Sequence, residues 1–363
     1  MRLIPVALVG KGSVGRALLR QFGETRDAYL RRGLDIRVTA VVGRTAGLYV
    51  QGGIAEDTLA EIAGGRARMP KRADGGDGPA GGWEEVTVNI AASGALGQIV
   101  VDATAEDDAR VHAAWLRRGW HVVTANKKPL TGPMLHYDAI IAGRDRPEAP
   151  CYRYGATVGA GLPVISSIQE MLATGDAVIE IRAAVSGTLG FIFSACEDGT
   201  PFAAAVAEAK ARGYTEPDPR DDLSGADVAR KALILGRLLG LRIELKDVPA
   251  ESLVPPALAG ADADVFMKGL GLHSRDIDDR FRAVAGRKHT LRYMLTVGAG
   301  GARVGIEEVS RHDPFAALKG PENLFVVRTR RYNAAPLAIR GPGAGADVTA
   351  AGMFADIVRV VRQ

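Results

Sequence analysis

The sequence is poor in cysteine and has no long apolar run. Cys151 and Cys196 are its 2 cysteines, too few for a disulfide framework and without the spacing of a zinc site. No stretch of about 20 apolar residues exists, so no membrane-spanning helix is expected. The first residues lack the charged, apolar and cleavage-site order of a signal peptide. These absences predict a cytoplasmic protein with reduced thiols that does not bind membranes.

A strong charge of one sign is also missing. The formal net charge is +4, from 46 Lys and Arg against 42 Asp and Glu. The arginines are scattered rather than grouped in a tract, so nucleic acid is not an expected partner. The 6 histidines are scattered without ligand spacing and are interpreted as structural. With 363 residues, 47% of them hydrophobic, the chain is long enough for two globular domains.

The first motif present is a glycine turn between a strand and a helix. An apolar run from Leu3 to Val9 predicts a buried parallel strand, and a helical pattern covers 16–22. Between them stand Gly10, Gly12, Ser13, Val14 and Gly15, in the pattern GxGxxG. Its glycines permit a tight turn and the close approach of a pyrophosphate to a helix N-terminus. The flanks favour a dinucleotide site over a turn kept only for packing.

The next strand, Ile36 to Val42, bears on the choice of cofactor. An NAD enzyme commonly carries an acid at its end, but Gly43, Arg44 and Thr45 follow here, and Asp35 lies at the other end. Arg44 can pair with a 2′-phosphate, so NADP is favoured, NAD remains possible, and a surface arginine is the alternative.

Two further strands, 98–103 and 121–124, are followed by Thr104 and Lys127. Ligands of open α/β sheets bind at the carboxyl ends of the strands, so both residues are expected beside the glycine turn. Residues 64–82, rich in glycine and charge, predict a surface excursion.

A change of pattern at 144–150 suggests a domain boundary. The glycine-rich loop 154–163 follows, and its carbonyls can ligate a hard cation, with a plain strand-to-helix connection as the alternative. The strand 178–185, a turn at 186–190, a helix at 202–212 and strands at 291–297 and 324–328 predict a mixed α+β domain.

An acidic segment, residues 214–227, precedes the first lysine of the next helix. Pro217 and Pro219 are expected to forbid helix, and Ser224 with Asp227 reads as a capping box. Asp227 and Lys231 are four residues apart and share a helix face. Burial favours the uncharged form of a lysine and nearby acids the charged form, so Lys231 is a candidate acid or base. A solvated helix N-terminus is the alternative.

The C-terminal region, like the N-terminal one, has a glycine-rich segment directly before a predicted helix. Glycines at 341, 343 and 345 precede a helix predicted at 348–361, which is expected to pack on the first domain. The sequence therefore predicts an α/β fold: a Rossmann-type, doubly wound parallel sheet from 1–150 plus 336–363, with a second α+β domain at 151–335 for substrate binding and dimerisation.

Several motifs together resemble the homoserine dehydrogenase family. They are GYTEPDPRDDLSGADVARK (213–231), close to the yeast-type enzymes, ATVGAGLP (156–163), SGTLGFIF (186–193), ANKKP (125–129), HDPFAALKG (312–320) and IRGPGAGADVTAAG (339–352). The resemblance is to the short, monofunctional type without a kinase or ACT domain. It implies reversible NAD(P)-dependent oxidation of L-homoserine to L-aspartate 4-semialdehyde in threonine and methionine biosynthesis, by a homodimer formed through the second domain.

The resemblance also assigns residues. It implies proton transfer by Lys231 and contact of Lys127 with cofactor and substrate. Substrate-binding residues would be Glu216, Asp222, Asp227, Gly187, Thr188 and Tyr214. The cofactor would contact Gly12, Ser13, Val14, Thr104, Lys127 and Gly345, beside Gly10, Gly15 and Arg44 from the motif and strand pattern. A monovalent cation, usually sodium, would bind carbonyls of Gly155, Val158, Ala160 and Leu162, although the family usually has Glu at the position of Gly155.

Two other functions fit the same motifs. A regulatory protein could bind NADP(H) without turnover, although a sensor has no need for both Lys127 and Lys231. A dehydrogenase of another small amino or hydroxy acid would share the cofactor turn and differ in its substrate. Rates with a panel of substrates separate these three.

Overall fold

The structure, a computed structural model, describes residues 1–43, 47–66, 97–107, 109–142 and 148–362, together with Thr87, 90–92 and Arg146. The chain divides into two compact units. The first is built from 1–161 and 344–363, and the second from 162–343. Arg44 and most of the excursion predicted at 64–82 lie outside the described residues.

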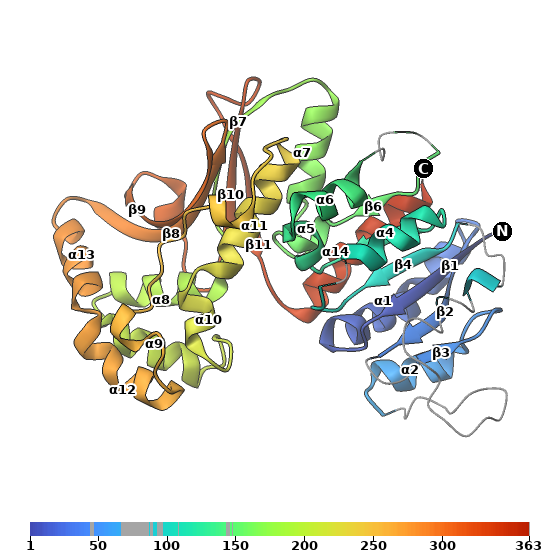
Figure 1. The fold of residues 1–363 in the computed structure, drawn as a ribbon, viewed down its shortest axis with the longest axis horizontal. Helices are drawn as coiled ribbons and strands as arrows, with labels where there is room; N and C mark the ends of the chain where they lie inside the picture. The colour runs from blue at the N-terminus through green and yellow to red at the C-terminus, as the bar shows by residue number, and fades with distance from the viewer. Residues whose placement is uncertain are drawn as a thin grey trace. The chain divides into compact units, whose positions relative to one another are not determined.

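The first unit contains a six-stranded sheet in the order β3-β2-β1-β4-β5-β6 (Figure 1). All neighbours are parallel except β2 and β3. The strands are β1 (Arg2–Val9), β2 (Leu34–Val42), β3 (Gly47–Tyr49), β4 (Ile99–Asp102), β5 (His121–Thr124) and β6 (Tyr152–Arg153). The strand order reverses between β1 and β4, which is the usual cofactor position in a doubly wound sheet.

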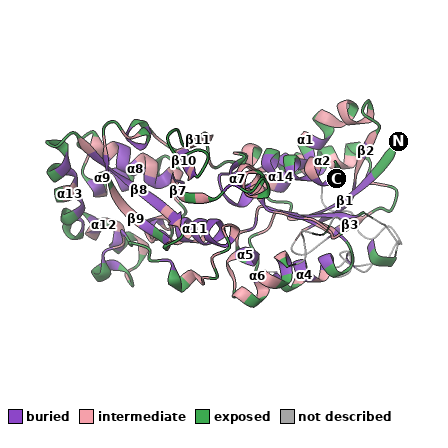
Figure 2. Ribbon diagram, turned by 90° about the horizontal axis from the view of Figure 1, so that it is seen from above, coloured by how far each residue is buried: buried purple, intermediate pink, exposed green. Residues whose placement is uncertain are grey.

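Helices cover both faces of this sheet. Figure 2 shows α1 (Ser13–Leu30) and α14 (Ala346–Val361) on one side, and α4 (Ala109–Arg117) and α6 (Met134–Ile141) on the other. The unit is completed by α2 (Glu56–Ala63), α5 (Lys128–Thr131) and the 3-10 turn η1 (Gly155–Thr157). The predicted Rossmann-type fold is confirmed, as is the return of the C-terminal helix to the first part of the chain.

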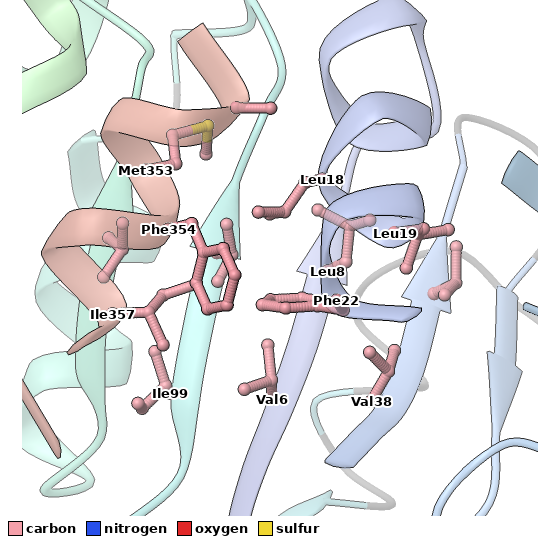
Figure 3. Packing of buried hydrophobic residues seen from close by; sticks show 14 of the residues in the cluster. Val6, Leu8, Leu18, Leu19, Phe22, Val38, Ile99, Met353, Phe354 and Ile357 are labelled. Carbon is pink, nitrogen blue, oxygen red and sulfur yellow. The ribbon is translucent and has the colours of Figure 1, made fainter. Parts of the chain in front are cut away.

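The core of the first unit joins α1, α14 and the sheet (Figure 3). Phe22 of α1 meets Phe354 of α14 edge to face, with ring centroids 4.9 Å apart and planes at 84°. Val6 and Leu8 of β1 belong to the same cluster and are fully buried. A strand buried on both faces reads as a continuous apolar run, and so β1 was recognisable from sequence.

The second unit is built on a five-stranded antiparallel sheet in the order β11-β10-β7-β8-β9 (Figure 1). Its strands are β7 (Val178–Ala184), β8 (His289–Gly298), β9 (Gly301–Ser310), β10 (Glu322–Thr329) and β11 (Leu337–Pro342). Its helices are α7 (Val164–Ala173), α8 (Gly187–Glu197), α9 (Phe202–Ala211), α10 (Pro219–Leu223), α11 (Ala226–Leu238), α12 (Ala263–His273) and α13 (Arg275–Ala285). The 3-10 turns are η2 (Leu245–Asp247), η3 (Pro256–Leu258) and η4 (Pro314–Ala317). The mixed α+β character expected of this part is confirmed.

Candidate active site

Lys231 lies on α11, and its side chain is only 10% exposed. Its Nζ donates a hydrogen bond of 2.6 Å to the carbonyl oxygen of Val185, at the end of β7. It also lies 2.9 Å from Oδ2 of Asp227, one turn earlier, which is 48% exposed. The predicted sharing of a helix face by Asp227 and Lys231 is therefore observed. A nearly buried amine fixed at two points can act on a ligand without first being reoriented.

The start of α11 differs from the predicted capping box. Gly225, not Ser224, is the N-cap, with φ of 71°. A Cβ at Gly225 would lie 2.0 Å from the hydroxyl of Tyr293, so only glycine fits this left-handed turn. Ser224 instead ends α10, where its hydroxyl donates to the carbonyl of Asp221 at 2.9 Å. The capping-box prediction was wrong because a second, short helix precedes the turn.

That short helix, α10, corrects a second expectation. Pro219 does not forbid helix but occupies the first turn of α10, where its missing N–H costs nothing. Asp218 is the N-cap, and its carboxylate accepts from the backbone N–H of Arg220. The Arg220 guanidinium, 2.6 Å away, hydrogen bonds to Asp218 and holds the pKa of that carboxyl below its ordinary value. Asp218 is therefore a structural member of the acidic segment.

Asp222 brings three of the predicted substrate residues together. Its carboxylate accepts from the backbone N–H of Glu216 at 2.8 Å, and the hydroxyl of Thr188 lies 2.9 Å from its Oδ1. The same hydroxyl is 2.6 Å from the carbonyl oxygen of Tyr214. Burial raises the pKa of the Asp222 carboxyl, while the hydrogen bonds from Glu216 and Thr188 oppose that rise. This cluster presents the exposed Glu216 and Tyr214 side chains to solvent.

Gly187 and Thr188 lie in the first turn of α8, where a simple turn was predicted. Ser186 is the N-cap, and its hydroxyl accepts from the backbone N–H of Leu189 at 3.2 Å. A Cβ at Gly187 would lie 3.2 Å from the Pro321 ring, so the helix start packs closely on the turn before β10. The turn expected at 186–190 is thus the beginning of a helix, because the serine side chain caps it.

In the first unit, the glycine turn between β1 and α1 brings backbone segments into close contact. Gly10 has φ of 101°, and its Cβ would lie 2.7 Å from the carbonyl of Ala103. A Cβ at Gly15 would lie 2.0 Å from the carbonyl of Gly10. Gly12 is different, because among the described residues no atom beyond its chain neighbours lies within 4 Å of its Cβ position. Packing does not demand Gly12, and the open space above it lies at the N-terminus of α1, with Ser13 and Val14.

A buried network holds the carboxyl ends of β4 and β5. Asp102 accepts from the backbone N–H of Thr104 at 2.9 Å and from the hydroxyl of Thr124 at 3.1 Å. His112 Nε2 is 3.1 Å from the same carboxylate. Burial alone would raise the pKa of Asp102, but the hydrogen bonds and charge of His112 and the bonds of Thr104 outweigh it, so the pKa is lowered. This network and its role were not visible in the sequence.

Asn126 links the loop that follows β4 to the loop that follows β5. Its amide donates to the carbonyl of Glu106 at 2.7 Å, and its Oδ1 accepts from the N–H of Lys128 at 3.1 Å. Lys127 stands between them, at the N-cap position of α5. Thr104 and Lys127 are therefore placed on adjacent loops at the edge where β1 leads into the glycine turn. Lys127 was predicted from its place after a strand, whereas no pattern in the sequence indicated the role of Asn126.

The loop predicted to hold a cation is tightly packed on α14. Gly159 and Ala160 have φ of 83° and 54°. A Cβ at Gly352 of α14 would lie 2.5 Å from the carbonyl of Ala160. Leu162 is the last residue whose carbonyl was predicted to ligate the cation. That carbonyl accepts a hydrogen bond of 2.8 Å from the N–H of Val164. Among the described residues, no group of three or more His, Cys, Asp or Glu side chains has the arrangement of a metal site.

Gly155 is hydrogen bonded to a carboxylate that leaves no room for a side chain at this position. Its N–H donates to Oδ2 of Asp356 at 2.7 Å, and a Cβ at Gly155 would lie 2.8 Å from that oxygen. Burial raises the pKa of Asp356, and the Gly155 N–H and the Arg359 charge oppose this rise. A carboxylate from α14 therefore stands where a side chain at 155 would begin.

Two more of the predicted cofactor residues remain. Arg44 lies outside the described residues, and Gly345 is the N-cap of α14 with φ of 114°.

Within the described ranges, no helix is both long and apolar enough to cross a bilayer. Cys151 and Cys196 are free thiols.

Comparisons with solved structures support the fold. A crystal structure of a Candida auris protein of unknown function is 29% identical, with a TM-score of 0.87, over 100% of this chain and 99% of that one. A hyperthermophilic archaeal homoserine dehydrogenase mutant in complex with NADPH is 25% identical, with a TM-score of 0.73, over 99% and 98%. A putative homoserine dehydrogenase of Archaeoglobus fulgidus, 22% identical, has a TM-score of 0.78 over 98% and 99% and supports the fold alone.

Comparisons with sequences decide the family. The family model for homoserine dehydrogenase matches residues 163–358. Homoserine dehydrogenase of Saccharomyces cerevisiae is 37% identical over 73% of this chain and 76% of the yeast protein. The chloroplastic bifunctional aspartokinase/homoserine dehydrogenase of Daucus carota is 40% identical over 98% of this chain, which spans 38% of the carrot protein. The resemblance drawn from the sequence motifs is confirmed: the chain belongs to the homoserine dehydrogenase family.

Proposed function

We propose that this protein oxidises L-homoserine reversibly to L-aspartate 4-semialdehyde with NAD(P), and so contributes to threonine and methionine biosynthesis. The observation that carries the proposal is the nearly buried Lys231 amine, fixed by Val185 and Asp227 in the same unit as the Thr188, Glu216 and Asp222 cluster. Family membership supplies the reaction class.

Lys231 is proposed to accept the hydroxyl proton of homoserine during oxidation and to return it in the reverse direction. An amine needs a fixed position for this role, and the hydrogen bond to Val185 supplies it. Asp227 would keep the amine near the reacting oxygen and stabilise the ammonium that forms. Lys127 would assist from the cofactor side.

Glu216 is proposed to bind the substrate ammonium, because its side chain is exposed and its backbone N–H is held by the Asp222 carboxylate. Asp222 and Thr188 would fix the shape of the segment, and Gly187 and Tyr214 would line the pocket. Placing the reacting atoms correctly can lower a barrier by several kcal/mol.

The cofactor, when bound, supplies the hydride acceptor. The residues of the first unit fit a dinucleotide, since space remains above Gly12 and the helix N-terminus at Ser13 and Val14 is open. Gly10 and Gly15 would keep the turn tight, and Thr104, Lys127 and Gly345 would make further contacts. Arg44 would bind a 2′-phosphate, which favours NADP over NAD.

The variant Arg44→Ala tests this preference. Its KM for NADP should rise, while its KM for NAD should stay unchanged.

Three finer points belong to the same proposal. Carbonyls of Gly155, Val158, Ala160 and Leu162 would bind a monovalent cation such as Na+, which replacement of sodium by choline in the assay would test. The protein would be a homodimer formed through the second unit, which light scattering would test. The free thiols of Cys151 and Cys196 support a reducing compartment such as the cytoplasm.

The decisive experiment measures initial rates with L-homoserine and either NADP or NAD, beside a panel of other small amino and hydroxy acids. We expect a rate with homoserine that exceeds the others by at least about tenfold, as expected where binding discriminates polar groups. Tight NADPH binding without any rate would instead favour a regulatory protein. A higher rate with another acid would identify a different dehydrogenase.

A further inference from the structure

We infer that Asn126 is a positioning residue for the cofactor. Its buried side chain ties the loop after β4 to the loop after β5, so that Thr104 and Lys127 meet the nicotinamide half of the dinucleotide in one fixed arrangement. The inference rests on the proposed function, and it concerns a residue to which neither the sequence motifs nor the comparisons assign a role.

The side chain of Asn126 reaches across to the loop after β4. The residue is 3% exposed, and its Nδ2 donates a hydrogen bond of 2.7 Å to the carbonyl oxygen of Glu106. The hydroxyl oxygen of Thr104 lies 3.4 Å from the same nitrogen, and it accepts a bond of 3.3 Å from the N–H of Glu106. The bond to the carbonyl is within the usual range for N–H and oxygen, and the longer contacts are weak. Asn126 therefore holds Glu106, and through it the place of Thr104.

The same side chain fixes the backbone around Lys127. Oδ1 of Asn126 accepts from the N–H of Lys128 at 3.1 Å, which makes a turn closed by the asparagine side chain. On the other side, the carbonyl of Lys127 accepts from the N–H groups of Leu130 and Thr131, each at 3.1 Å. The backbone of Lys127 is thus held between the asparagine and α5. One amide sets both this backbone and its distance from the loop after β4.

Strand order tells which half of the cofactor these loops serve. The order β3-β2-β1-β4-β5-β6 reverses between β1 and β4, and a dinucleotide lies across such a reversal with one mononucleotide on each side. Arg44, the residue proposed for the 2′-phosphate of the adenosine half, follows β2 in the sequence. The nicotinamide half then falls to the loops after β4 and β5. Asn126 joins these two loops, and its own bonds go to them alone within the described part of the chain.

Gln98 offers a matched amide without this role. It is 1% exposed, and its Nε2 donates to the carbonyl oxygens of Pro5 and Ile99 at 3.0 and 2.8 Å. Gln98 stands directly before β4, so it lies at the opposite edge of the sheet from the carboxyl ends of the strands. Its amide ties the same sheet together, but far from the loops that would meet a cofactor.

The test compares Asn126→Ala with Gln98→Ala, using NADPH and adenosine 2′,5′-bisphosphate as probes in calorimetry. The second probe lacks the nicotinamide half. We expect Asn126→Ala to raise the Kd for NADPH by about tenfold or more and to leave that for the bisphosphate within about twofold, since only the loops after β4 and β5 lose their tie. Gln98→Ala should lower the melting temperature and leave both Kd values within about twofold of wild type.

Turnover gives a second readout. With homoserine, kcat/KM of Asn126→Ala should fall by about tenfold or more with NADP and with NAD alike, because the loops no longer hold the reacting end in place. This pattern differs from that of Arg44→Ala, which should affect NADP alone. A third variant, Asn126→Ser, can still accept from the N–H of Lys128 but is too short to reach Glu106. It should behave as Asn126→Ala does, and it serves alone should the alanine variant not fold.

Unchanged binding of NADPH in the folded Asn126 variants would overturn the role of Asn126. An equal loss for both probes would overturn it as well, because the whole unit would then be disturbed. A wild-type protein that binds NADPH without any homoserine-dependent rate would overturn the proposed function, while the Kd values would still decide the role of Asn126. A wild-type protein that binds neither probe would overturn both.

Discussion

The amine of Lys231 and the carbonyl of Val185 are joined by a hydrogen bond of 2.6 Å, which ties the second turn of α11 to the end of β7. The lysine is thereby held in place by the sheet as well as by its own helix. Its other contact, Asp227, is half exposed and contributes little to stability on its own.

Replacement of this lysine should abolish turnover without unfolding the protein. In Lys231→Met the apolar stem is kept and the amine is lost, so kcat should fall by about 10³-fold, within the range for a lost acid–base group. Lys268→Ala, at an exposed position of α12, is the matched control and should keep the full rate. A Lys231→Met enzyme with near wild-type kcat would assign the proton transfer elsewhere.

Asp102 should make the stability of the first unit depend on pH. Its carboxylate is buried and paired with His112, and its pKa is lowered in the folded state. The stabilising contribution is therefore complete above the ordinary pKa of 3.8 and is lost as the pH falls through the folded value. Asp102→Asn should cost about 3 kcal/mol at pH 7, as for a broken buried pair.

Denaturant unfolding between pH 3 and pH 7 checks this expectation. The difference between wild type and Asp102→Asn should be constant from about pH 5 upward and should shrink below the ordinary carboxyl pKa. A difference of the same size at every pH would show that Asp102 acts by shape rather than by charge.

Gly352 should be irreplaceable even by alanine. The added methyl would lie 2.5 Å from the carbonyl of Ala160, so either α14 or the loop must move. Gly352→Ala should lower the free energy of unfolding by about 1–3 kcal/mol, as overpacking does. Ala351→Ser, on the exposed face of the same helix, should change it by less than about 0.5 kcal/mol. Equal stability of the two variants in urea would contradict the close packing of the loop.

Phe354 should be among the most important core residues of the first unit. Its ring fills the space between α1, α14 and the sheet (Figure 3), and it is 8% exposed. Phe354→Ala should cost about 3–5 kcal/mol of unfolding free energy. Leu135→Ala, at a side chain that is 77% exposed, is the control. Thermal unfolding of both variants measures the difference, and similar losses would mean that the two helices do not depend on this contact.

Local patterns in the sequence predicted the parts of the fold that depend on local physics. The apolar run of β1 and the glycines after it specify a strand and a turn by themselves. The acidic segment was harder: Pro219 was interpreted as a helix breaker, yet a proline in the first helical turn is well tolerated. The capping box at Ser224 failed because the left-handed Gly225 stands between the two helices.

Contacts between distant residues could not be predicted in this way. Gly155 and Asp356 are 201 residues apart, and no periodicity connects them. The pairing of Asp102 with His112, and the bond from Asn126 to the loop after β4, depend on strand register and tertiary packing. Family resemblance named the expected site residues, but it did not reveal the side chains that hold their loops.

The first unit takes its last helix, α14, from beyond the whole second unit in the chain. During synthesis a ribosome would therefore finish the antiparallel unit before it delivered Met353, Phe354 and Ile357 to the parallel one. Until then α1 and the sheet would expose an apolar face to the translating cell. The first unit would therefore be the more prone to aggregate during synthesis, although its first strand is made before any part of the second unit.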